Sequence, residues 1–66
     1  MFSVGDTVIA LERIKYYGVP TDVVGRQGVV VQVNLYNQFL VRFNESVNWW
    51  TKEDGIKLLY DANEVV

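Results

Sequence analysis

Two short segments bring together side chains that could bind another molecule. The first is Arg13-Ile14-Lys15-Tyr16-Tyr17, in which cations alternate with apolar and aromatic residues. The second is the adjacent pair Trp49-Trp50. Cations beside aromatic rings suit cation–π contacts, and exposed aromatic rings suit a protein surface or a stacked base. Both segments therefore indicate recognition of a partner.

The residues needed for common catalytic mechanisms are largely missing from the sequence. The chain has no histidine and no cysteine, which excludes Ser–His and Cys–His nucleophiles and metal sites built on imidazole or thiolate. The one carboxylate pair, Glu53-Asp54, is adjacent in sequence and is expected on a solvated helical turn, where it favours the start of that turn. We therefore expect no catalytic residue, no metal, no cofactor and no enzymatic activity.

Strand alternation determines how the two tryptophans are used. Adjacent residues of a strand point to opposite faces, so we expect one of Trp49 and Trp50 to enter the core and the other to face outward. An outward indole is a suitable contact for a partner. Alternatively, it covers Leu59, Val65 or Val66 near the end of the chain.

The segment from Arg13 to Tyr17 falls in a long predicted loop, and two interpretations are open for it. It binds a partner, or it folds back so that Ile14 and one tyrosine are buried while Arg13 and Lys15 stay solvated. A nucleic-acid site would draw on four cations: Arg13, Lys15, Arg26 and Arg42. Because the net charge is −2, we place a protein partner ahead of nucleic acid.

Length and composition limit how this chain can be stabilised. Sixty-six residues predict one domain, 1–66, with residues 61–66 as a fraying tail. Without cysteine there is no disulfide, so stability must come from apolar packing or from a partner, and half of the residues are hydrophobic. We find no signal peptide and no apolar run of membrane-spanning length, and expect a cytoplasmic protein without membrane contact.

The pattern of apolar residues and turn signals predicts five short strands. They are expected at Thr7–Glu12, Gln27–Val33, Gln38–Phe43, Val47–Thr51 and Ile56–Tyr60. The connection from Arg13 to Val24 contains Pro20, which argues against a central strand there. Asn34–Asn37 and Asn44–Ser46 read as turns, and Lys52–Gly55 as a single helical turn closed by glycine.

This order of elements predicts an all-β fold, specifically an SH3-like small barrel of five short strands with one helical turn before the last strand. The alternative is another small Greek-key barrel such as the OB-fold. That fold usually has a longer chain and a true helix between its third and fourth strands. The only helical candidate here is one turn long and precedes the last strand.

Two resemblances accompany this fold. Gly5-Asp6-Thr7-Val8, followed by Gly25-x-x-Gly28-x-Val30-x-x-Val33, is similar to the KOW motif of ribosomal proteins and transcription factors. That resemblance implies RNA contact near Arg26.

The segments from Gly28 to Val33 and from Phe39 to Phe43, with Val47-Asn48 and Glu53-Asp54, resemble two accessory subunits of the same barrel type. These belong to photosystem I and to ferredoxin–thioredoxin reductase. The resemblance implies a non-catalytic chain that packs against a partner.

These observations predict a non-catalytic protein-interaction module that acts as an accessory subunit or as a small regulator or inhibitor of a larger protein. The alternative is a KOW-like nucleic-acid-binding protein. The side chains expected to contact a protein partner are Arg13, Lys15, Tyr16, Tyr17, Trp49 and Trp50.

Overall fold

The computed structural model describes residues 2–44 and 47–61, with the side chain of Val47 left out. Residues 45–46 of one predicted turn and residues 62–66 of the predicted tail lie outside the described residues. The elements, in chain order, are β1 (Thr7–Ala10), η1 (Glu12–Tyr17), η2 (Thr21–Val23), β2 (Gln27–Val33), β3 (Gln38–Asn44), β4 (Val47–Lys52), η3 (Glu53–Gly55) and β5 (Ile56–Tyr60). The fold is all-β, with a single 3₁₀ turn before the last strand, as predicted.

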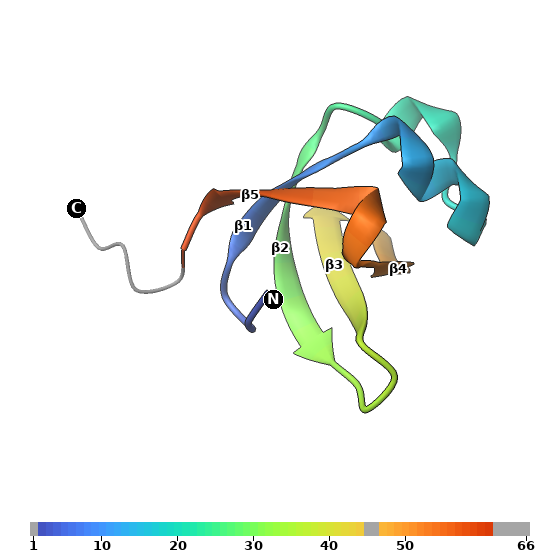
Figure 1. Ribbon diagram of the computed structural model, residues 1–66. Coiled ribbons are helices and arrows are strands. Elements are labelled where there is room, and N and C mark those ends of the chain that lie inside the picture. Colours follow the sequence, from blue (N-terminus) through green and yellow to red (C-terminus); the bar gives the residue numbers. More distant parts are fainter. Residues whose placement is uncertain (1, 45–46, 62–66) are drawn as a thin grey trace.

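Within the described ranges the five strands form one antiparallel sheet in the order β4-β3-β2-β1-β5. Strands β2, β3 and β4 follow one another as hairpins, and β5 returns to pair with β1 (Figure 1). The sheet therefore ends at β4 on one side and at β5 on the other.

The alternation of side chains in β2 and β3 builds most of the core. Val30, Phe39 and Val41 are completely or almost completely buried, and Arg42 faces out, as period-2 patterning requires. Gly28 is needed here for space, since a Cβ at this position would lie 2.6 Å from Cγ1 of Val41. Gly25, with φ of +85°, supplies the turn before the strand.

The long first connection contributes to the core instead of lying over the surface. It holds η1 and η2, which the sequence did not reveal, and it buries Ile14, Val19 and Val23. Strand β1 is correspondingly shorter than predicted and ends at Ala10. The chain turns away there because the Leu11 amide donates to the Gly55 carbonyl oxygen at 2.9 Å.

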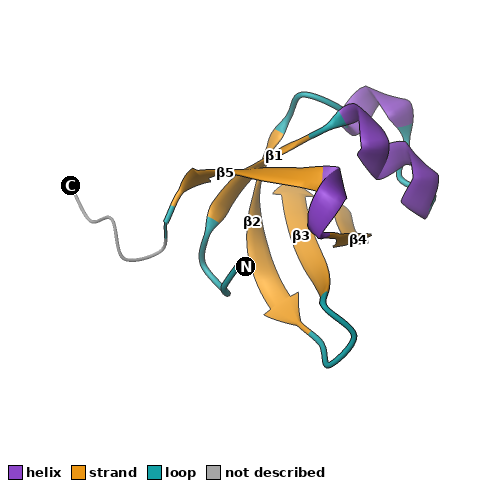
Figure 2. Ribbon diagram, viewed as in Figure 1, coloured by secondary structure: helices purple, strands orange, loops and turns teal. Residues whose placement is uncertain are grey.

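The three 3₁₀ helices gather at one end of the sheet, where η1 packs against η3 (Figure 2). None of the helices in residues 2–44 and 47–61 is long and apolar enough to cross a membrane. This arrangement places the predicted binding loop beside the turn that precedes β5.

Candidate functional site

Helix η1 presents its charged and aromatic residues because one apolar residue fixes it to the core. The Ile14 side chain is fully buried, whereas Arg13 and Tyr16 are exposed and Tyr17 is half-buried. Gly18 ends the helix in the left-handed region, with φ of 81°. Of the two interpretations left open for this segment, the burial of Ile14 matches the loop that folds back, yet both tyrosines remain accessible.

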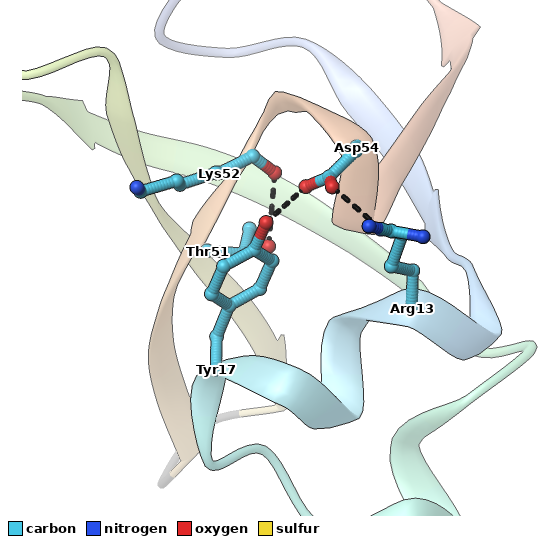
Figure 3. A network of polar contacts seen from close by, with 5 residues as sticks. All are labelled: Arg13, Tyr17, Thr51, Lys52 and Asp54. Atoms are coloured by element: carbon cyan, nitrogen blue, oxygen red, sulfur yellow. Dashed lines mark hydrogen bonds and ion pairs between the residues drawn. The ribbon is translucent and has the colours of Figure 1, made fainter.

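A polar network joins η1 to η3 (Figure 3). The Arg13 Nε–H donates to Oδ2 of Asp54 at 2.8 Å, and the Tyr17 hydroxyl donates to Oδ1 of the same carboxylate. The Arg13 guanidinium also lies 5.6 Å from the centre of the Tyr16 ring, a cation–π contact. We call Arg13, Tyr17 and Asp54 the Asp54 network. It holds the Tyr17 ring in one place on the surface.

The Asp54 network shifts two pKa values away from neutrality. The hydrogen bond from the Tyr17 hydroxyl holds the pKa of the Asp54 carboxyl below its ordinary value of 3.8, and Arg13 lowers it further. The same hydrogen bond, followed by partial desolvation, raises the pKa of Tyr17 above 10.0. General acid–base catalysis works best with groups that titrate near the working pH. This pair is therefore suited to positioning rather than to proton transfer at neutral pH.

A shallow groove of about 460 Å³ runs beside the Asp54 network. It brings together η1, the β2–β3 turn, the end of β4 and η3. Its lining residues are Tyr17, Tyr36, Asn37, Lys52, Glu53 and Asp54. We call it the tyrosine groove, because two tyrosine rings supply its apolar surface. Tyr36 is absent from the predicted site. A sequence signal for it exists, because an aromatic residue inside a predicted hairpin turn is expected to be exposed and able to contact a partner.

The two tryptophans face opposite sides of β4, as predicted. Trp49 packs against the core, and its indole N–H is buried without a hydrogen-bond acceptor among the described residues. Trp50 is opposite Leu40 in the β3–β4 register, and 38% of its surface is exposed. Trp50 and Lys52 are two residues apart in one strand, so both side chains point to the outer face. The exposed indole is therefore on the same face of β4 as Lys52, which lines the tyrosine groove.

Val65 and Val66, two of the residues that the outer indole was expected to cover in the alternative packing, lie outside the described residues. Leu59, the third residue of that alternative, is exposed on β5. Strand β5 is at the end of the sheet opposite to β4 in the pairing order.

The four cations predicted for nucleic-acid contact do not share one element. Arg13 and Lys15 are on η1, and each is paired with a carboxylate, Lys15 with Glu12 at 3.0 Å. Arg26 precedes β2 and donates to the Asp22 carbonyl oxygen at 3.1 Å. Arg42 lies on the outer face of β3, where its Nε–H donates to Asn48 at 3.3 Å.

Among the described residues, no group of three or more acidic, histidine or cysteine side chains is placed to hold a metal ion. Comparison of the chain with protein-family models, with curated proteins and with solved structures gives no match. The KOW-like and accessory-subunit resemblances therefore stay predictions.

Proposed function

We propose that this chain is a non-catalytic protein-interaction module, an accessory subunit or small regulator or inhibitor of a larger protein, built on an SH3-like barrel. Three features support the SH3-like assignment: the strand order, the long first connection and the 3₁₀ turn before β5. The observation that carries the functional proposal is the tyrosine groove, together with the exposed Trp50 indole on the same strand as the lining residue Lys52.

Aromatic burial would supply most of the affinity at this surface. Tyr17 from η1 and Tyr36 from the β2–β3 turn line the groove, and Trp50 is on the outer face of β4, two residues before the lining residue Lys52. Tyrosine and tryptophan dominate binding energy at interfaces because they bury a large area with few rotatable bonds. The Asp54 network fixes Tyr17 before a partner arrives, which reduces the entropy lost on binding.

The charges around the groove would orient the partner. Lys52, Glu53 and Asp54 are consecutive residues of its lining, so cation and anion lie within a single short segment. Mixed charges at the rim of an interface set register and exclude wrong partners more than they add affinity. The same mixture argues against a phosphate backbone, which needs a surface of one positive sign.

The KOW-like alternative is the weaker proposal for an electrostatic reason. Two of its four cations, Arg13 and Lys15, have carboxylate partners, so η1 presents little net positive charge. The whole chain is acidic, with a net charge of −2. A nucleic-acid interface would also lose affinity steeply with added salt, whereas an aromatic interface would not.

Affinity capture with matched variants tests the proposal. The tagged chain is incubated with lysate of its source cells, with and without nuclease treatment, beside Tyr17→Ala, Trp50→Ala and the control Leu58→Ala on β5. Leu58 is an exposed apolar residue outside the groove lining. We expect one stoichiometric protein with the wild type and the control in both lysates, and about tenfold less of it with Tyr17→Ala and with Trp50→Ala.

Tyr17→Phe separates the ring from its hydroxyl, and we expect it to retain most of the capture. All variants are first checked for wild-type thermal unfolding. If all four variants capture as much protein as the wild type does, the tyrosine groove and Trp50 are not the binding surface. Loss of every companion after nuclease treatment would move the assignment to the nucleic-acid alternative.

A further inference from the structure

The most exposed apolar residues of the described chain are next to each other in the turn between β2 and β3. We call this turn, Asn34–Asn37, the hairpin tip. Leu35 is 98% exposed and Tyr36 is 80% exposed. The turn extends beyond the body of the molecule (Figure 1). Single exposed apolar residues are ordinary, but an adjacent leucine and tyrosine on a protruding turn form a compact apolar projection.

The hairpin tip is held in shape by one side chain. The Asn34 carboxamide oxygen accepts hydrogen bonds from the amides of Tyr36, at 2.9 Å, and Gln38, at 3.0 Å. Its amide nitrogen donates to the Gln38 side chain at 2.6 Å, and its backbone N–H donates to the Gln38 carbonyl oxygen at 3.1 Å. Asn37 completes the turn in the left-handed region, with φ of 56°.

The exposed apolar area of the hairpin tip is unfavourable in water, and covering it costs little conformational entropy. Because the backbone is already fixed, a partner that covers Leu35 and Tyr36 immobilises only a few side-chain torsions. The two side chains offer a large apolar area with a single polar atom at its end, the tyrosine hydroxyl. Such a projection fits a concave pocket and contributes little against a flat surface.

We propose that the hairpin tip is an anchor that inserts Leu35 and Tyr36 into an apolar pocket on the surface of the partner protein. The inference rests on the proposed function, since it specifies the surface that the partner must have. Tyr36 also lines the tyrosine groove, so the tip and the groove form one continuous contact surface. The partner's pocket is apolar, with a polar atom at its rim for the Tyr36 hydroxyl.

The charge pattern favours a protein pocket over a lipid surface. Residues 34–38 are Asn, Leu, Tyr, Asn and Gln, so the tip carries no lysine or arginine. Stable binding at a membrane interface combines an inserted apolar group with basic residues that attract anionic headgroups. The charged side chains that line the groove are one cation, Lys52, and two anions, Glu53 and Asp54, so they form no basic patch for such headgroups.

Site-specific photocrosslinking and binding measurements test the anchor. A benzoylphenylalanine residue replaces Leu35 in the tagged chain, or replaces Val4, an exposed aliphatic residue in a different turn, as the control. We expect the probe at position 35 to form an adduct with one protein, on apolar residues that line a recess of its surface. The control position is expected to give no such adduct.

The adduct partner is then purified, and its dissociation constant is measured for tip variants and matched controls. We expect Leu35→Ser and Tyr36→Ser each to weaken binding about tenfold or more, and Tyr36→Phe to change it less than about threefold. The controls Val4→Ser and Tyr60→Ser are expected to bind as the wild type does. The substituted side chains are solvent-exposed, so folding is retained and is verified by urea unfolding.

The remaining outcomes overturn the anchor in distinguishable ways. If both serine variants at the tip bind with wild-type affinity while Tyr17→Ala and Trp50→Ala bind more weakly, the anchor is refuted and the proposed function still holds. Wild-type affinity of all these variants would refute both. The wild type is also sedimented with vesicles of phosphatidylcholine and of equal parts phosphatidylcholine and phosphatidylglycerol. Vesicle binding that Leu35→Ser abolishes would assign the tip to a membrane and refute the protein pocket.

Discussion

Replacement of Gly55 by alanine should destabilise the fold by crowding the contact between η3, β4 and η1. A Cβ at this position would lie 2.2 Å from Oγ1 of Thr51 and 3.2 Å from both Cα and Cγ1 of Ile14. Thr51 is almost completely buried, and its hydroxyl donates to the Lys52 carbonyl oxygen at 3.0 Å. The crowding therefore cannot be relieved without a cost, because Thr51 must rotate or the backbone of η1 must move.

The size of the effect follows from these contacts. Adding a methyl group to a packed interior costs about 1–3 kcal/mol, and a backbone atom among the neighbours places this site near the upper end, at about 2–3 kcal/mol. In a domain of this size each kcal/mol lowers Tm by about 4–8 °C. We therefore expect a fall in Tm of about 8–24 °C.

Urea unfolding followed by tryptophan fluorescence measures this loss, since Trp49 packs against the core. Thr51→Ala removes the closest atom. The double variant should therefore lose about 1 kcal/mol less free energy of unfolding than the two single variants lose in sum. Gly18→Ala is the matched control: its φ is +81° and no atom lies within 4 Å of an added Cβ. Its loss of about 1 kcal/mol reflects backbone strain, which Thr51→Ala cannot relieve. A Gly55→Ala variant as stable as the wild type, or strict additivity of its loss with that of Thr51→Ala, would show that Gly55 is not needed for space against Thr51.

Three further predictions concern the strand packing, the hairpin tip and the Asp54 network. Gly28→Ala should lower the free energy of unfolding by about 1–3 kcal/mol, because its Cβ would meet Val41 and Phe43 side-chain atoms at 2.6 and 2.9 Å. A change below about 0.5 kcal/mol in urea unfolding would contradict this packing. Asn34→Ala should speed hydrogen exchange of the Tyr36 and Gln38 amides by about tenfold, since both lose their acceptor. Unchanged exchange would show that the turn does not depend on this side chain. The Asp54 network should stabilise the fold above pH 3.8, with the Asp54 contribution lost as pH falls through its lowered folded-state pKa. The Tyr17 contribution should be full below pH 10.0 and lost as pH rises through its raised folded-state pKa. Spectroscopic titration of Tyr17 in the wild type and in Asp54→Asn checks this, and a Tyr17 pKa at or below 10.0 in the wild type would contradict it.

The strands were predictable because their signals are local. Alternating apolar residues and glycine-containing turns define β2 and β5 with the bounds observed, and β3 and β4 to within one residue at their ends. The helical turn before β5 was also visible, from an acidic pair followed by glycine. These features depend on residues next to one another in sequence.

Helices η1 and η2 were not predictable, because tertiary contacts form them. The segment from Glu12 to Tyr17 has one buried residue, Ile14, and its six residues are too few to show a helical repeat of apolar residues. Its position is fixed by the Asp54 network and by the bond between Leu11 and Gly55, which join residues more than 35 positions apart. A loop interpretation was therefore the natural result of local reasoning.

The candidate site was predictable only in part. Alternation shows that Trp49 and Trp50 face opposite sides, but it does not say which is outward. The pairing of Trp49 with the buried Val41 decides that question, and the sequence contains no equivalent signal. Tyr36 was missed because its role depends on the hairpin tip lying beside Lys52 and η3.

The most direct test of the proposed binding surface is a nuclear magnetic resonance titration of the isotope-labelled chain with the purified partner. We expect the amide signals of Tyr17 and Tyr36 and the indole signal of Trp50 to shift together, while those of Leu58 and Tyr60 on β5 keep their positions. Shifts confined to β1 and β5, with the signals around the tyrosine groove unchanged, would contradict it.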